Sequence, residues 1–128
     1  MSLVLVDSSV WIDYFRSGRS VDIAYFNEIV DNNNICINDI ILSELIPQLR
    51  FQKESEVIDI LQSVRKIPLK INWDIIIDYQ FSNIKNGINK VGIPDLIILQ
   101  NVIDNDLILY SLDKHFKSMN LFYKFRMV

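Results

Sequence analysis

Hydrophobic residues occur along this chain in two patterns, short continuous runs and rows spaced three or four positions apart. A continuous run bounded by polar residues is typical of a buried β-strand, and a spaced row is typical of an amphipathic helix. Strands are expected at residues 3–6, 35–37, 67–69, 107–110 and 121–125. Pro68 places the third of these at a sheet edge or at the start of a strand.

The spaced rows predict helices between these strands. They are expected directly after Asp7, over about 21–31, after a cap at Asn38 or Asp39, around 57–64, from the cap Asn72 to about 86–89, and over 96–103. A polar loop over residues 16–20 separates the first two, and Pro47 should kink or end the third within a turn.

Two of the expected helices have distinctive apolar patterns. In the helix after Asn72, one face carries Trp73, Ile77, Phe81, Ile84 and Ile88. Residues 96–103 are apolar nearly all round, so that helix should be buried, either centrally or at a subunit interface.

Strands that alternate with helices predict an α/β fold, in which a mostly parallel central sheet is flanked by helices on both faces. The length of 128 residues, with no internal repeat or linker, indicates a single domain over residues 1–128.

Four acids should meet at one edge of this sheet. In a parallel sheet, the carboxyl ends of the strands and the amino ends of the following helices lie at the same edge. Asp7 and Asp113 follow two strands, Asp95 lies in the first turn of a helix, and Glu44 lies in the first or second turn of another. Divalent cations that prefer oxygen ligands would offset the repulsion between these carboxylates, and such a site can activate water and stabilise a phosphodiester in transit.

Each acid also has an ordinary structural explanation. Asp7 is a possible helix cap, Asp95 suits a helix dipole, Glu44 could face solvent, and Asp113 could form a turn. Their coincidence at one edge favours the functional interpretation. Ser8, Ser9 and Ser111 are interpreted as caps and hydrogen-bond partners, because the lone His115 has no evident place as their base.

The net charge, the cysteine count and the length of the apolar runs exclude several classes of protein. A net charge of −3 argues against a protein that coats nucleic acid, but leaves room for a basic rim formed by Arg16, Arg19, Lys90 and Lys114. The single Cys36 offers no disulfide framework, and every apolar run is too short to span a bilayer. We therefore expect a cytoplasmic protein with no membrane partner.

Four segments resemble the motifs of PIN-domain nucleases: VDSSVWI at 6–12, LSEL at 42–45, IPDLII at 93–98 and SLDKHF at 111–116. In length and motif order the chain is similar to VapC toxins of toxin–antitoxin systems. The resemblance implies a PIN-like α/β/α sandwich and a Mg²⁺- or Mn²⁺-dependent endoribonuclease, a hydrolase of RNA that is usually a homodimer and is inhibited by a cognate VapB-type antitoxin.

The resemblance also assigns roles to residues. It implies that Asp7, Glu44, Asp95 and Asp113 form the catalytic, metal-binding set, with the hydroxyl of Ser8 beside the first acid. Ser111 stands where the family often has threonine, and Pro47 follows Glu44 closely. Arg16 and Lys114 are the expected phosphate contacts, together with Arg19 and Lys90.

Two other functions remain open at this point, a receiver-like phospho-accepting domain that binds Mg²⁺ and a catalytically silent PIN-fold binding module. The receiver fits poorly, because Asp7 is followed by serines rather than by a second acid. A homodimer is expected, since residues 96–103 and the aromatic tail with Phe122, Tyr123 and Phe125 exceed what one small core needs.

Overall fold

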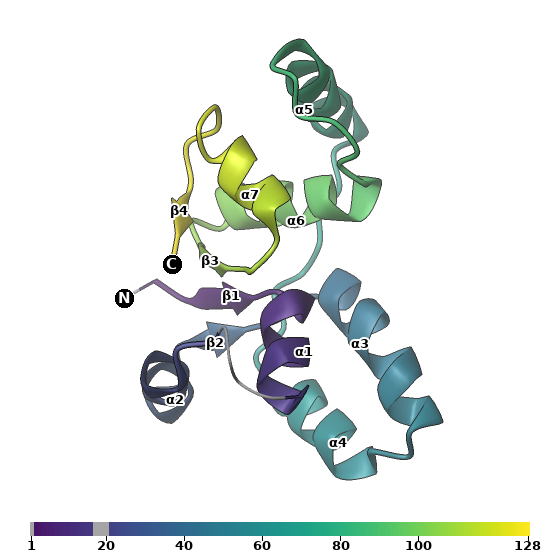
Figure 1. Cartoon of the computed structure of the whole chain (residues 1–128), viewed down its shortest axis with the longest axis vertical. Helices are drawn as coiled ribbons and strands as arrows, with labels where there is room; N and C mark the ends of the chain where they lie inside the picture. The colour runs from purple at the N-terminus through teal and green to yellow at the C-terminus, as the bar shows by residue number, and fades with distance from the viewer. Residues whose placement is uncertain (1, 17–20) are drawn as a thin grey trace.

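The computed structural model describes residues 2–16 and 21–128 (Figure 1). Most of the expected polar loop, including Arg19, lies outside the described residues. The helices are α1 (Ser8–Arg16), α2 (Ile23–Asp31), α3 (Asp39–Phe51), α4 (Ser55–Ser63), α5 (Trp73–Lys85), α6 (Ile93–Asp104) and α7 (Lys114–Met119).

Four parallel strands form the sheet in the order β2-β1-β3-β4. Their bounds are β1 (Val4–Val6), β2 (Ile35–Cys36), β3 (Ile108–Tyr110) and β4 (Arg126–Met127). The two central strands are in register, with Val6 beside Tyr110, so the residues that follow them emerge together at one edge. Helices α1–α4 gather around the β1–β2 half, and α5–α7 around the β3–β4 half (Figure 1). The expected α/β fold with a parallel sheet is confirmed.

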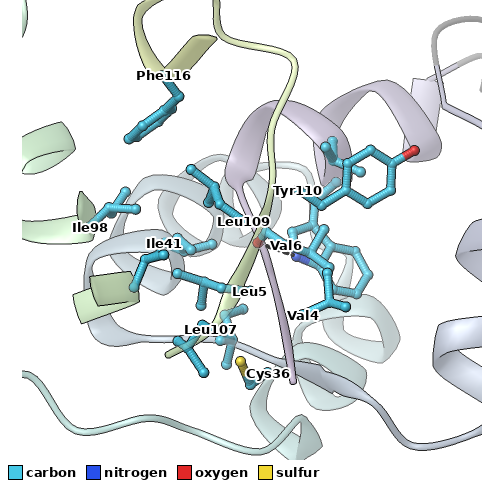
Figure 2. Packing of buried hydrophobic residues seen from close by; sticks show 14 of the residues in the cluster. Val4, Leu5, Val6, Cys36, Ile41, Ile98, Leu107, Leu109, Tyr110 and Phe116 are labelled. Atoms are coloured by element: carbon cyan, nitrogen blue, oxygen red, sulfur yellow. Dashed lines mark hydrogen bonds between the residues drawn. The ribbon is translucent and has the colours of Figure 1, made fainter. Parts of the chain in front are cut away.

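Alternation along the strands places hydrophobic side chains on both faces of the sheet. Figure 2 shows Leu5 and Leu109 on the face that also receives Ile41, Ile98 and Phe116 from α3, α6 and α7. Val4, Val6 and Tyr110 point to the opposite face (Figure 2). Because both faces are buried around β1, β2 and β3, each of these three strands reads as a continuous apolar run.

Several expected elements differ in the structure. Residues 67–69 form no strand, since this segment meets the sheet only through a bridge between Ile37 and Lys66. The last strand is β4 rather than residues 121–125, and Leu121 and Phe122 are exposed. The short α7 was not predicted, because its apolar pattern covers little more than one turn.

Other expectations are confirmed. Asn38, rather than Asp39, caps α3, and the helix continues through Pro47 to end at Phe51, about one turn later. Asn72 caps α5 as predicted. Residues 96–102 of α6 are all buried, so this helix is central. Among the described residues, no helix is long and apolar enough to cross a membrane.

Candidate active site

Asp7 is held rigidly at the carboxyl end of β1. Its side chain is only 5% exposed. The hydroxyls of Ser9 and Ser111 both donate to its Oδ2 atom, each at 2.8 Å. These hydroxyls in turn accept the backbone N–H groups of Leu112 and Asp113, each at 3.0 Å. The ends of the two central strands are thereby locked around one buried carboxylate.

Glu44 reaches the same edge from the second turn of α3. The cap Asn38 sets the start of this helix by accepting the N–H of Ile41 at 3.0 Å. The Glu44 side chain lies exposed at the rim, with Oε1 3.5 Å from the Ser8 hydroxyl. Partial desolvation, followed by the negative charges of Asp7 and Asp95, raises the pKa of Glu44 to about 7. Glu44 therefore faces the other acids across the edge of the sheet.

Asp95 and Asp113 lie close together at the same edge. Asp95 is in the first turn of α6, directly after Pro94, which suits that position. Asp113 caps α7, and its Oδ1 atom accepts the N–H of His115 at 2.9 Å. Burial, followed by the charges of Asp113 and Asp7, raises the pKa of Asp95 to about 6.

His115 is a site residue that sequence reasoning missed. Its Nδ1 atom lies 3.3 Å from Asp113 Oδ1, and its positive form lowers the pKa of Asp95. Asp113, Asp95 and His115 each offer one ligand atom, and these atoms lie within 4.8 Å of one another. The signal in the sequence was the position of His115 two residues after Asp113. Because Asp113 caps the helix, its carboxylate lies beside the imidazole of His115.

The donor atoms suit a divalent cation. In octahedral coordination with ligands at about 2.1 Å, neighbouring donor atoms are about 3.0 Å apart and opposite ones about 4.2 Å apart. The Asp95, Asp113 and His115 atoms lie within 4.8 Å of one another, a wider bound than either separation. Carboxylate oxygens favour Mg²⁺ and Mn²⁺. Desolvation, and after it the neighbouring negative charges, raise the pKa values of Asp95 and Glu44, and a bound cation would offset those charges.

The structure distributes the other expected residues around this cluster. Ser111 bonds Asp7 directly, whereas the Ser8 hydroxyl lies beside Glu44, so the nearby hydroxyl that holds Asp7 belongs to Ser9. Arg16 ends α1 and Lys114 begins α7; both are exposed. Within residues 2–16 and 21–128, neither side chain forms a hydrogen bond or ion pair with the acids.

A groove leads away from Glu44 between α1, α3 and α4. Its volume is about 370 Å³, and both apolar and charged side chains line it. The lining residues include Ile12, Phe15, Arg16, Leu45, Leu49 and Val57. A groove that combines apolar side chains with an acid and a cation is suited to an extended or helical peptide segment.

Comparisons with known proteins agree with this architecture. A structure titled as DNA-bound VapBC from Salmonella typhimurium matches with a TM-score of 0.75 at 15% identity, covering 100% of this chain and 98% of that one. VapBC2 from Rickettsia felis, bound to a promoter DNA fragment, matches with a TM-score of 0.76 at 15% identity, covering 98% and 97%. VapBC-1 from nontypeable Haemophilus influenzae matches with a TM-score of 0.68 at 17% identity, covering 98% of this chain and 96% of that one.

Structural likeness at such low sequence identity establishes only a shared fold. No curated protein matches the chain by sequence. The family itself is shown by a different comparison. The family model described as "PIN domain" matches residues 4–120, which include the ends of both central strands and all four predicted acids. This chain belongs to the PIN domain family.

Proposed function

We propose that this chain is a VapC-type toxin, a metal-dependent endoribonuclease formed by residues 1–128 as one domain. The observation that carries the proposal is the gathering of Asp7, Glu44, Asp95 and Asp113 at one sheet edge, where two of them have strongly raised pKa values. Membership of the PIN family supports a nuclease. It also removes the basis for a receiver-like domain.

Asp7, Asp95 and Asp113, with Glu44 at the rim, are the residues that would hold Mg²⁺ or Mn²⁺. A bound divalent cation would supply an activated water and stabilise charge on the phosphodiester. Ser9 and Ser111 already orient Asp7, so this side chain would lose little conformational entropy on binding a cation. Glu44, which borders the site beside the Ser8 hydroxyl, is proposed to accept a proton from the attacking water.

Arg16 and Lys114 are proposed to contact the phosphates of the RNA on either side of the cleaved bond. Both are exposed and lie on elements that border the acidic edge, at the end of α1 and the start of α7. Phosphate contacts of this kind position a nucleic acid without reading its sequence.

A VapB-type antitoxin is the proposed inhibitor. The similar solved structures are VapBC complexes, and here a groove of about 370 Å³ runs from Glu44 between α1, α3 and α4. A segment of the antitoxin lying in that groove would reach the acidic edge and obstruct access of RNA to Glu44.

Cleavage of a structured RNA by the purified chain tests the nuclease proposal. Activity should require Mg²⁺ or Mn²⁺, stop with EDTA, and leave 5′-phosphate and 3′-hydroxyl ends if water is the nucleophile. Asp95→Asn should lower the rate by at least about a hundredfold, since it removes one carboxylate of the site. Asp59→Asn, at an exposed acid of α4, is the matched control and should leave the rate unchanged.

Undiminished cleavage in EDTA, or 2′,3′-cyclic phosphate ends, would contradict the metal-dependent mechanism. A chain that binds Mn²⁺ and RNA but cleaves no substrate would instead be the silent binding module.

A further inference from the structure

His115 brings a nitrogen atom to a site whose other donor atoms are carboxylate oxygens. It stands in the first turn of α7, where side chains lean back toward the start of the helix. Asp113 caps that helix, and the fully buried side chain of Phe116 anchors the helix in the core. The imidazole of His115 is therefore held beside the acids rather than left free to move in solvent.

His115 makes two different contacts with the same oxygen of Asp113. Its backbone N–H donates to Asp113 Oδ1 at 2.9 Å, which is the cap of the helix. Its ring Nδ1 atom lies 3.3 Å from that oxygen. A hydrogen bond between a charged imidazole and a carboxylate is shorter, at about 2.7–2.9 Å. Two neighbouring ligands of one tetrahedral ion are about 3.3–3.4 Å apart when each lies at about 2.0–2.1 Å from it. The observed distance is closer to the separation of two ligands.

Asp95 supplies a third donor from a different helix. One ligand atom of Asp95, one of Asp113 and one ring nitrogen of His115 lie within 4.8 Å of one another. Asp95 belongs to the first turn of α6, so the three donors converge from two helix starts. The side chains of His115 and Asp113 are 27% and 34% exposed, which leaves room for water or a phosphate oxygen on an ion held there.

A nitrogen ligand changes which ion a site prefers. Mg²⁺ takes oxygen ligands and keeps several waters, so a nitrogen donor adds little to its binding. Imidazole nitrogen suits Zn²⁺, and the affinity of mixed nitrogen and oxygen sites for transition ions rises from Mn²⁺ through Co²⁺. The nitrogen of His115 therefore gives this edge a means of discrimination that carboxylates alone lack.

We propose that His115 is a metal-binding residue of this site, and that its ring nitrogen makes the site select Mn²⁺ and Zn²⁺ over Mg²⁺. The inference rests on the proposed function, because it adds one ligand to the cation of the same acidic edge. The alternative role of His115 is that of a positioning residue, which would hold Asp113 through Oδ1 without touching the ion.

The imidazole can be observed directly, because His115 is the only histidine of the chain. In ¹⁵N NMR of the untagged full chain, Zn²⁺ should shift the signal of one ring nitrogen strongly, since a ligand nitrogen gives its lone pair to the ion. Saturating Mg²⁺ should shift neither nitrogen comparably. Ring signals that stay in place while calorimetry shows Zn²⁺ binding would overturn the proposal.

His115→Asn distinguishes a ligand from a positioning residue. The asparagine amide keeps an N–H donor near Asp113 but offers an oxygen instead of a ring nitrogen. In calorimetry, Zn²⁺ affinity should fall by at least about 10–100-fold, the usual loss when even a residue that only orients a ligand is removed. Mg²⁺ affinity should not fall, because an amide oxygen suits that ion. Lys117→Gln, at an exposed residue of the same helix, is the matched control and should change neither affinity.

The outcomes separate this proposal from the proposed function. Equal weakening of Zn²⁺ and Mg²⁺ in His115→Asn would make His115 a positioning residue, which overturns the proposal and leaves the nuclease intact. A wild type that binds neither Mg²⁺, Mn²⁺ nor Zn²⁺ would remove the metal site, and both proposals with it. Circular dichroism verifies that the variant is folded, and the NMR result on the wild type decides the question without any variant.

Discussion

The carboxylates of the acidic edge differ in how well the fold compensates their negative charge. Asp7 is buried but receives two hydroxyl hydrogen bonds, whereas Asp95 and Glu44 lie near like charges without comparable compensation. The site therefore combines one carboxylate whose position is fixed by hydrogen bonds with two whose ionisation the fold opposes. This combination is expected where a cation completes the structure.

The stability of the metal-free protein should depend on Asp95 in a defined pH window. Its pKa rises from 3.8 unfolded to about 6 folded, so the folded state binds the proton more tightly. The resulting stabilisation is fully present below about pH 4 and is lost as the pH rises through 6. Glu44, raised from 4.5 to about 7, extends the same trend to neutral pH.

Melts in EDTA across pH 4–8 check this trend. Asp95→Asn should raise the melting temperature at pH 7.5 by about 3–6 °C, the shift that about 1 kcal/mol produces in a domain of this size. The difference between variant and wild type should shrink toward pH 4. A difference that is constant with pH, or of opposite sign, would show that Asp95 is a purely structural helix-start acid.

Ser111 should matter for stability as well as for the site. Ser111→Ala leaves buried Asp7 with one hydroxyl donor fewer, which should cost about 1–3 kcal/mol of unfolding free energy. It should also weaken Mn²⁺ binding by about 10–100-fold, the usual effect of losing a residue that orients a ligand. Denaturant unfolding and Mn²⁺ titration measure the two effects.

Ser63→Ala is the control for this variant, since that exposed hydroxyl only bonds the Ile60 carbonyl of its own helix. Equal losses in the two alanine variants would rule out a special role for Ser111.

At the level of elements, helix caps decide where the acids stand. Asn38 caps α3 and also donates to Asn101 Oδ1 of α6 at 3.0 Å, which joins the helices that carry Glu44 and Asp95. Asn101 donates in turn to the Pro68 carbonyl at 3.0 Å, so residues 67–69, which form no strand, are still hydrogen-bonded to α6. Asp113 has two roles, because it caps α7 and belongs to the acidic edge.

Removal of the two asparagine caps should have unequal effects. Asn38→Ala eliminates a buried cap and leaves Asn101 without its partner, so a loss of about 2–4 kcal/mol is expected. Asn72→Ala removes only the exposed cap of α5 and should cost about 1 kcal/mol. Chemical unfolding of both variants checks the comparison. Losses of the same size would mean that the Asn38–Asn101 bond adds nothing.

At the level of the whole molecule, the site joins elements from both ends of the chain. Asp7 follows the first strand, Glu44 and Asp95 come from helices on different halves of the sheet, and Asp113 follows β3. The cluster exists only in the folded state, because an unfolded chain cannot hold these carboxylates together. Any ion that binds it must therefore stabilise the fold.

Metal binding should thus raise global stability at neutral pH. At a hundredfold excess over its dissociation constant, Mg²⁺ or Mn²⁺ should add about 2.7 kcal/mol to the unfolding free energy. Asp95→Asn should lose most of this increment, and Asp59→Asn should retain it. Melting temperatures with metal and with EDTA measure the effect. A wild-type melting temperature that neither Mg²⁺ nor Mn²⁺ changes would contradict a metal site at this edge.

The sequence by itself determined the order of most elements, the parallel α/β fold and the edge at which the acids gather. Hydrophobic spacing and cap residues are local signals, and they are strong where a segment is long or buried on both faces, as at β1 and α6. The rule that strand ends and helix starts share an edge then predicts the gathering of Asp7, Glu44, Asp95 and Asp113.

Only the tertiary structure decided which apolar face would be covered and which polar groups would meet. Both α5 and α6 carry large apolar residues, yet contacts to Tyr123 and Val91 hold one apolar row of α5 outward while α6 fills the core. The bond from Ser111 to Asp7 and the bond from the Leu112 N–H to the Ser9 hydroxyl likewise join segments about a hundred residues apart. Such pairings arise from long-range packing, which no local pattern of residues encodes.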